Sequence, residues 1–344
     1  MIDIKSQTKA EIEAFLLSKG EQKFRASQIY DWLWKKGAQS FEEMSNLSKQ
    51  TRTLLSENFS LYFPTIDTKL VSSDRTIKIA FRLFDNSLIE GVIIPSSDRA
   101  TACISSQVGC ALQCSFCATG TLGFKRNLTA AEIYDQTVIL NQLATETFGY
   151  GLSNIVMMGM GEPLQNYKNV MEAITHITSP DGMGMSPQRL TLSTAGLAPQ
   201  IKQLADDGFK CNLAISLHSA DEAIRSRLMM INNAHLLDSL REAIHYFSQK
   251  TGSRVTMEYL ILNNINDSID DAQKLAIFCR AFPSKINIIE YNQTDNSPFK
   301  STTPERLKEF VSFLESKNMI VNVRASKGKD IDAACGQLVN KKRS

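Results

Sequence analysis

The apolar pattern of the first part of the chain is helical. Apolar residues recur at helical spacing over Lys9 to Ser18, Ala26 to Lys36 and Lys49 to Glu57, and polar turns containing Gly20 and Gly37 separate these stretches. This spacing places the apolar side chains of each stretch on one face of a helix. The sequence therefore predicts a small helical N-terminal accessory domain over residues 1–70.

The pattern changes to strand-like alternation between Lys69 and Pro95. β-branched residues gather around residues 76–79 and 92–94, as is typical of strands. The polar pair Asp85-Asn86 lies between these two stretches and favours a turn. Residues 71–98 are therefore predicted to form a β-hairpin that links the helical domain to the rest of the chain.

Residues 99–344 alternate between strand-like and helical stretches. Repeated strand–helix units predict a parallel sheet wrapped by helices, with the active site at the carboxyl ends of the strands. Six or seven strands are too few to close an eight-stranded barrel, so we expect an α/β fold with a partial, open TIM-like barrel. The expected strands are Ala102 to Ser106, Asn154 to Met158, Arg189 to Thr194, Asn212 to Leu217, Arg254 to Ile261, Ile286 to Tyr291 and Ile320 to Val323. The expected helices are Ala130 to Ala144, Tyr167 to Ile177, Ala198 to Ala205, Leu236 to Lys250, Ile269 to Phe282 and Pro304 to Lys317.

The composition is that of a globular protein, with 43% hydrophobic and 22% charged residues. No signal-like succession follows Met1, and no apolar run is long enough to span a bilayer, so we expect a cytoplasmic protein without membrane attachment. The seven cysteines are an odd number, which argues against a disulfide framework and favours reduced thiols. The net charge of +2 means that any affinity for RNA must come from local basic patches.

Three cysteines form the sharpest chemical signal in the sequence. Cys110, Cys114 and Cys117 have the spacing CxxxCxxC and directly follow the first expected barrel strand. A zinc site would need a fourth protein ligand, and no second Cys or His pair with matching spacing occurs in the sequence. A four-iron cluster held by three thiolates instead leaves one iron open for a substrate. The weaker alternatives are a zinc knuckle and three core cysteines that cluster by chance.

This spacing resembles the cluster motif of the radical S-adenosylmethionine (SAM) superfamily. The resemblance implies a [4Fe-4S] cluster on Cys110, Cys114 and Cys117, and a SAM molecule whose amino and carboxylate groups bind the open iron. Electron transfer to the sulfonium then produces a 5'-deoxyadenosyl radical.

Polar and glycine residues follow several of the expected strands. Gly161 and Glu162 belong to the sequence MGMGEP, which is similar to the superfamily's motif that binds the amino group of SAM. The glycines would let the backbone approach a ligand closely, and the Glu162 carboxylate would accept a hydrogen bond from an ammonium group. Taken alone, this stretch is an ordinary turn between a strand and a helix. Further candidates for SAM contacts are Ser193, Ser216, Leu217, His218 and Asn292, although each of them alone is equally compatible with local capping.

Two more cysteines complete the pattern. Cys103 precedes the cluster motif, and Cys335 lies in the C-terminal sequence DIDAACGQL, whereas Cys211 and Cys279 lie in apolar stretches and are expected to be core thiols. Together, these features resemble the RNA methyltransferase family that makes 2-methyladenosine, whose close relative methylates adenine at C8. The resemblance covers nearly the whole chain, and the residues around Cys110 and the proline of GEP favour the C2 enzyme.

The family resemblance implies a mechanism with two thiols. One SAM methylates Cys335, a second supplies the radical that activates the S-methyl group, the resulting methylene radical adds to C2, and Cys103 releases the product by forming a disulfide with Cys335. Glu90 matches the position of a general base; its alternative is an ordinary exposed strand carboxylate. The implied substrates are adenines in 23S rRNA, at the peptidyl transferase centre, and in tRNA, 3' of the anticodon.

Partners follow from the same resemblance. We expect a monomer that receives electrons from a donor such as flavodoxin or ferredoxin. Basic and aromatic residues could hold phosphates and bases of RNA, although core packing is the better interpretation for the aromatic ones. The competing hypothesis from another class is a metal-stabilised RNA-binding protein without catalysis. The candidate RNA contacts are Lys23, Arg25, Tyr30, Trp32, Trp34, Lys35, Lys36, Lys125, Arg126, Arg324, Lys327, Lys329 and Lys341 to Arg343.

Overall fold

The computed structural model describes residues 1–293 and 297–338 of the chain. Its helices are α1 (Lys9–Ser18), α2 (Phe24–Trp34), α3 (Lys49–Asn58), α4 (Ala130–Phe148), α5 (Tyr167–Thr178), α6 (Ala198–Asp206), α7 (Glu222–Leu228), α8 (Leu237–Thr251), α9 (Ile269–Cys279) and α10 (Pro304–Ser316). Short 3₁₀ helices are η1 (Ile4–Ser6), η2 (Ala118–Leu122), η3 (Pro163–Asn166), η4 (Pro187–Arg189), η5 (Met230–Asn233) and η6 (Lys329–Ile331). No helix among the described residues combines the length and apolar character needed to cross a bilayer.

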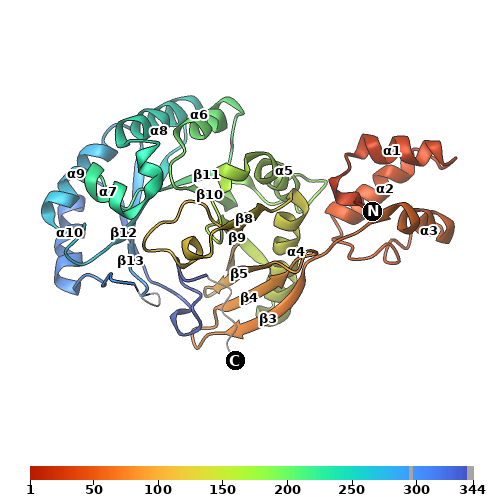
Figure 1. Ribbon diagram of the computed structural model, residues 1–344, viewed down its shortest axis with the longest axis horizontal. Helices are drawn as coiled ribbons and strands as arrows, with labels where there is room; N and C mark the ends of the chain where they lie inside the picture. Colours follow the sequence, from red (N-terminus) through yellow and green to blue (C-terminus); the bar gives the residue numbers. More distant parts are fainter. Residues whose placement is uncertain (294–296, 339–344) are drawn as a thin grey trace.

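Ten strands form one mixed sheet (Figure 1). Along the sheet they are β14 (Val321–Arg324), β13 (Ser284–Glu290), β12 (Val255–Ile261), β11 (Asn212–Ser216), β10 (Leu190–Thr194), β9 (Leu152–Met157), β6 (Ala100–Cys103), β5 (Leu88–Pro95), β4 (Ile77–Arg82) and β3 (Thr65–Val71). The seven strands from β6 to β14 pair in parallel. Among the described residues β14 and β3 are the two ends of the sheet and do not pair, so the predicted open, partial barrel is confirmed.

The expected hairpin is part of the main sheet. Its turn lies at Asp85-Asn86, where Asn86 takes the left-handed conformation, and β4 pairs with β5 in antiparallel fashion. However, β5 also pairs with β6, and β3 begins at Thr65, inside the range expected for the helical domain. The segment predicted as a link therefore supplies β4 and β5, and together with β3 these strands extend the barrel sheet in antiparallel fashion.

The helical domain packs against the outer side of the barrel rather than over its mouth. Figure 1 shows α1–α3 as a lobe beside α4 and α5. The strands β1 (Ile2–Asp3) and β2 (Phe59–Ser60), which flank the helices of this lobe in the sequence, pair in parallel. The Lys5 ammonium lies 2.6 Å from the Asp135 carboxylate of α4, and both residues are buried. The Trp34 ring stacks on the His176 ring of α5 with 3.5 Å between the ring centroids. Core packing is thus the correct interpretation for Trp34.

Acid should weaken this docking through His176. Burial, followed by the charge of Lys5, lowers the pKa of His176 to about 4, whereas an unfolded histidine titrates near pH 6.5. Between about pH 6.5 and about pH 4, the histidine is therefore protonated in the unfolded chain but neutral in the folded chain. The free energy of unfolding consequently decreases as the pH falls through this range. Between about pH 7.5 and about pH 5 we expect the free energy of unfolding to fall by about 2 kcal/mol more in the wild type than in His176→Phe.

Urea unfolding followed by tryptophan fluorescence measures this difference, because the chain's two tryptophans, Trp32 and Trp34, both lie in α2. His176→Phe keeps an aromatic ring against Trp34 and removes the titrating imidazole. Other titrating groups, such as Asp135, remain in both proteins, so their contribution cancels when the two pH dependences are compared. An identical pH dependence in the two proteins would refute the assignment.

Candidate functional site

Two adjoining cavities lie at the carboxyl ends of the parallel strands, where a barrel of this kind places its active site. Their volumes are about 170 Å³ and about 140 Å³, and Cys117 and Cys335 are among the residues that line both. The predicted site residues that line the larger cavity are Cys110, Cys114, Cys117, Gly161, Glu162, Ser193, Ser216, His218 and Cys335. Residues from the cysteine loop, from the ends of β9, β10 and β11, and from the C-terminal segment thus meet at one place.

The three thiols of the CxxxCxxC motif all line the larger cavity. Within residues 1–293 and 297–338, no three His, Cys, Asp or Glu groups lie close enough to hold a single metal ion. Burial raises the pKa of Cys110 to about 11 and that of Cys114 further still, and the neighbouring thiols add to both shifts. Three thiolates would therefore be unfavourable here without a cationic group between them. This donor set fits a multi-iron cluster better than a zinc ion.

The frame of the cysteine loop comes from a small hairpin of β7 (Gln107–Gly109) and β8 (Phe124–Asn127). The Cys110 N–H donates to the Gly123 carbonyl over 2.9 Å. A Cβ on Gly109 would lie 1.8 Å from that same oxygen, and Gly109 has a φ of +74°, so only glycine fits at this position. The hairpin thus fixes the start of the cysteine loop.

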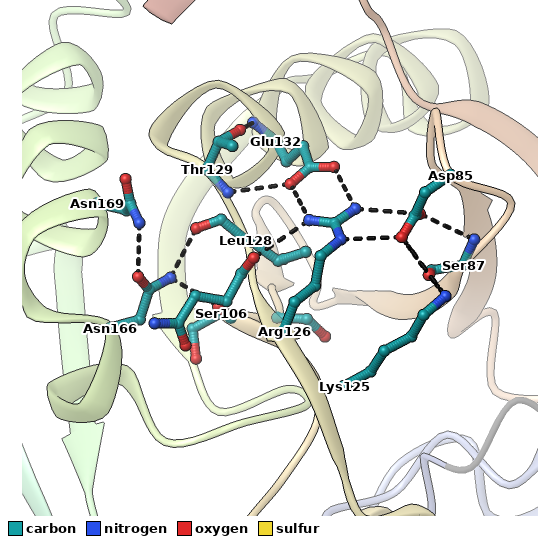
Figure 2. Close-up of polar contacts among 12 residues, drawn as sticks. Asp85, Ser87, Ser106, Lys125, Arg126, Leu128, Thr129, Glu132, Asn166 and Asn169 are labelled. Atoms are coloured by element: carbon teal, nitrogen blue, oxygen red, sulfur yellow. Dashed lines mark hydrogen bonds and ion pairs between the residues drawn. The ribbon is translucent and has the colours of Figure 1, made fainter.

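Figure 2 shows two polar groups that anchor this hairpin. The Asn166 amide of η3 donates to the carbonyls of Ser106 and Leu128 over 2.9 and 2.7 Å. The Arg126 guanidinium of β8 lies between the carboxylates of Asp85 and Glu132. Because the N–H groups along two edges of its guanidinium are engaged by these ion pairs, Arg126 is a structural residue, and its predicted role as an RNA contact is not supported.

The GEP turn presents a buried carboxylate to the larger cavity. Glu162 is 3% exposed, and its oxygens accept from the N–H groups of Leu164 and Ala195 over 2.9 and 2.7 Å. Burial raises the pKa of Glu162 to about 7, against these backbone hydrogen bonds. Gly161 has a φ of +99°, and a Cβ there would lie 2.5 Å from the Gln107 side chain. The turn is therefore shaped by glycine so that Glu162 reaches the cavity.

His218 is held as a neutral hydrogen-bond donor. Its Nδ1 accepts from the Leu260 N–H over 3.0 Å, so the proton of the neutral ring is on Nε2. Burial, followed by the charge of Arg225, lowers the pKa of His218 to about 3. The Asn266 side chain donates to the carbonyls of His218 and Leu260. The ring is therefore fixed in orientation and protonation on the cavity wall.

Two predicted SAM contacts do not line either of these cavities. Leu217 is fully buried and belongs to the main core, and its N–H donates to the Glu258 carbonyl over 3.0 Å. Asn292 is 5% exposed, and its Oδ1 accepts no hydrogen bond from the described residues. A buried acceptor of this kind is costly unless a partner is supplied, so Asn292 has an open position for a donor.

The two additional cysteines lie together. Cys103 ends β6, and it lines the smaller cavity together with Cys335. Burial raises the pKa of Cys103 to about 12, and the charge of Cys335 adds to this rise. Both thiols are free, Cys103 being buried and Cys335 exposed. Cys211 and Cys279, by contrast, are buried in the main core, as expected.

The segment that carries Cys335 is fixed on both sides. On one side the Lys78 ammonium donates to the Asp332 carbonyl over 3.1 Å, and the Gly328 N–H donates to Asp74 over 3.0 Å. On the other side the Ala118 N–H, next to Cys117, donates to the Gly336 carbonyl over 2.8 Å. These contacts place Cys335 between the antiparallel strands and the cysteine loop.

Glu90 is not the exposed carboxylate of the alternative interpretation. It is 2% exposed, and its carboxylate lies 3.0 Å from the Lys78 ammonium. The same ammonium binds the Asp332 carbonyl of the Cys335 segment. Glu90 does not line the two cavities, so it is connected to the site through Lys78.

Sequence reasoning missed one charged residue of the site and gave a second one a different role. Glu258 lines the larger cavity, and its carboxylate lies 3.5 Å from the Arg324 guanidinium, which lines the smaller one. The available signal was a single charged residue in the apolar strand β12. Arg324 was predicted as an RNA contact; its position beside Cys103 and Cys335 gives it a place in the site itself. Lys341 to Arg343 lie outside the described residues.

Comparison with known proteins agrees with this geometry. The family model of the ribosomal RNA large subunit methyltransferase N-terminal domain matches residues 2–61, and that of the radical SAM superfamily matches residues 104–276. A protein of Cytophaga hutchinsonii named "Probable dual-specificity RNA methyltransferase RlmN" is 50% identical, over 98% of this chain and 93% of its own length. A protein of Christiangramia forsetii with the same name is 49% identical over 98% and 96%. The chain belongs to the RlmN family.

A solved structure supports the same family. The crystal structure of a radical SAM methyltransferase from Sphaerobacter thermophilus has a TM-score of 0.93 and 39% identity, and covers 98% of this chain and 99% of its own. Members of the radical SAM superfamily use a [4Fe-4S] cluster and SAM, so the two expected cofactors are confirmed for this RlmN-family chain. The superfamily also gives the open α/β fold that the sequence predicted.

Proposed function

We propose that this chain is a radical SAM methyltransferase that transfers a methyl group to C2 of adenine in RNA, through S-methylation of Cys335. The observation that supports this most directly is the position of Cys335, which lines the cavity of the three motif thiols and also the cavity of Cys103. One side chain can therefore receive a group in the first cavity and present it in the second. The names of the relatives, dual-specificity RNA methyltransferases, support RNA as the substrate.

Cys110, Cys114 and Cys117 would hold the cluster in the larger cavity. Glu162 would accept from the amino group of SAM, and the neutral His218 would donate from Nε2. Ser193 and Ser216 line the same wall, Leu217 offers backbone groups, and the Asn292 Oδ1 lacks a donor among the described residues. When bound, the cluster and SAM together supply a radical that removes hydrogen from a methyl group; the residues named here bind and orient them.

Cys335 and Cys103 would carry the protein's own part of the reaction. The Cys335 thiolate attacks the methyl carbon of SAM, so that an S–C bond forms in the protein, the methyl–sulfonium bond breaks and S-adenosylhomocysteine leaves. After hydrogen removal, the methylene carbon adds to C2 of the adenine. The adduct then loses the C2 proton and one electron, which the oxidised iron-sulfur cluster would take up. Attack of the Cys103 thiolate on the Cys335 sulfur then forms the disulfide, breaks the S–C bond, and leaves a methyl group once the released carbon takes up a proton.

Glu90 is our candidate for the base that receives the C2 proton. Its carboxylate is paired with Lys78, which also binds the Asp332 carbonyl, so movement of the Cys335 segment would change the surroundings of the carboxylate. Two basic residues, Arg324 and Lys327, line the smaller cavity and would attract the phosphates beside an extruded adenine.

We further propose 23S rRNA and tRNA as the substrates, a flavodoxin or ferredoxin as the electron donor, a monomer as the working form and the cytoplasm as its location. These assignments follow the family and the mechanism, which consumes electrons to start the radical step and to reduce the disulfide.

Nucleoside mass spectrometry after anaerobic turnover tests the function. The cluster-reconstituted protein is incubated with unmodified RNA, SAM and a reductant, and the digested RNA is compared with authentic standards. We expect 2-methyladenosine. The appearance of 8-methyladenosine instead would assign the C8 reaction, and RNA binding without any methyladenosine despite an intact cluster would favour a protein that binds RNA without methylating it.

A further inference from the structure

A buried arginine lies behind the wall of the larger cavity. Arg225 of α7 is 0% exposed, and its guanidinium makes three hydrogen bonds. It donates to the carbonyl of Leu217 over 3.1 Å and to that of Ala195 over 2.6 Å, and its third partner is the Asn232 side-chain oxygen. Ala195 directly follows β10 and Leu217 directly follows β11, so Arg225 joins the ends of two strands that line the site.

All three acceptors of Arg225 are neutral. Within residues 1–293 and 297–338, no carboxylate forms an ion pair with Arg225. The side-chain amide of Asn232 in turn donates a hydrogen bond to the carboxylate of Glu222, which is an exposed residue. A guanidinium that is fully removed from water is unfavourable unless an anion balances its charge. Among the described residues, the carboxylate that acts on Arg225 is thus that of Glu222, beyond Asn232, and no opposite charge binds the guanidinium directly.

The cysteine loop is the neighbour that could supply it. The Ser115 N–H and hydroxyl both donate to the Leu228 carbonyl at the end of α7, over 3.0 and 3.2 Å. Leu112 belongs to the same apolar cluster as Leu228, and Cys110 and Cys114 pack against it. The helix that carries Arg225 is therefore packed directly against the loop of the three cysteines.

We propose that Arg225 is a positioning residue whose buried charge is balanced by the iron-sulfur cluster and raises the cluster's reduction potential. This inference rests on the cluster of the proposed function. Three thiolates around a doubly charged [4Fe-4S] core leave a net negative charge, and one-electron reduction makes it more negative. A fixed positive charge in a poorly solvated wall stabilises the reduced form more than the oxidised form. Arg225 thereby eases the electron transfer that starts the reaction.

The charge of Arg225 and its hydrogen bonds can be separated by substitution. Arg225→Lys keeps a positive charge but loses the fork that joins Ala195 to Leu217. Arg225→Met removes the charge and keeps an unbranched side chain. Arg227→Met removes a charge from the same helix at an exposed position, and solvent screens that charge from the site. This variant is the matched control.

The test is a redox titration of the full-length, cluster-reconstituted proteins without SAM, followed by electron paramagnetic resonance of the reduced cluster. For Arg225→Met we expect the ratio of reduced to oxidised cluster at a fixed potential to fall by about tenfold, which corresponds to a shift of about 59 mV for a one-electron couple. Arg225→Lys and Arg227→Met should stay near the wild type. An unchanged potential in Arg225→Met, or an equal fall in Arg225→Lys, would overturn the proposal.

Failure of Arg225→Met to bind the cluster would also be decisive. Thermal unfolding of the cluster-free proteins then shows whether the fold survives. A cluster-free variant as stable as the cluster-free wild type supports the charge balance, because only the bound form needs the cation. A variant that is unfolded without the cluster overturns it. If the wild-type protein itself showed no iron-sulfur absorbance, the proposed function would be contradicted. This result is distinguishable from the two outcomes for Arg225→Met, because it is measured on the wild type.

Discussion

Cys335→Ala is expected to abolish methylation of RNA completely. The proposed reaction builds the new carbon group on the Cys335 sulfur, and no other described thiol lines both cavities except the motif cysteine Cys117. Nucleoside mass spectrometry of RNA incubated with the variant should detect no methyladenosine. The variant should retain its iron-sulfur absorbance and should still cleave SAM, because Cys110, Cys114 and Cys117 are unchanged.

Cys211→Ala is the matched control for this prediction. Cys211 undergoes the same chemical change but is buried in the main core, away from both cavities. Its loss should cost about 1 kcal/mol of stability, as removal of a small buried group does, and should leave methylation at the wild-type level. If Cys335→Ala still produced methylated RNA, the S-methylcysteine route would be wrong.

Cys103→Ala is expected to trap the RNA on the protein. In the proposed sequence, the adduct between Cys335 and the adenine is released only when the Cys103 thiolate attacks the Cys335 sulfur. Cys103 lines the smaller cavity together with Cys335, so it is the thiol placed for this step. After one anaerobic turnover, a covalent protein–RNA species should persist in denaturing gels, including those run with a thiol reductant, because a thioether is not reducible by thiols.

The double variant Cys103→Ala, Cys335→Ala provides the control, since it lacks the atom to which the RNA would be linked. It should give no covalent species. Free 2-methyladenosine at the wild-type rate from Cys103→Ala would show that another group releases the product, and would remove Cys103 from the mechanism.

Much of the fold was predictable because it depends on local order in the sequence. The helices α1, α4 and α9 begin at capping boxes formed by Thr8, Thr129 and Ser268, a signal that lies within four residues. The central parallel strands β10, β11 and β12 read as apolar stretches because most of their residues on both faces are buried. The missed helix α7 has only seven residues, too few for its periodicity to stand out.

The cluster ligands were equally local, since three cysteines within one loop need no tertiary contact to be recognised. Cys103 and Cys335 were paired only through the family resemblance. Their proximity depends on contacts between distant segments, such as those of Lys78 with the Asp332 carbonyl and of Ala118 with Gly336, which no local pattern announces.

The helices and strands of the barrel, its open sheet and the motif thiols could be predicted, because spacing and periodicity along the chain encode them. The partners of the charged side chains could not be predicted and became known only from the folded structure. It enclosed Arg126 between two carboxylates, paired Glu90 with Lys78, and left Arg225 buried among neutral acceptors. The physical reason is that the free energy of a charge depends on burial and on partners from distant segments, and neither is a property of the residue type.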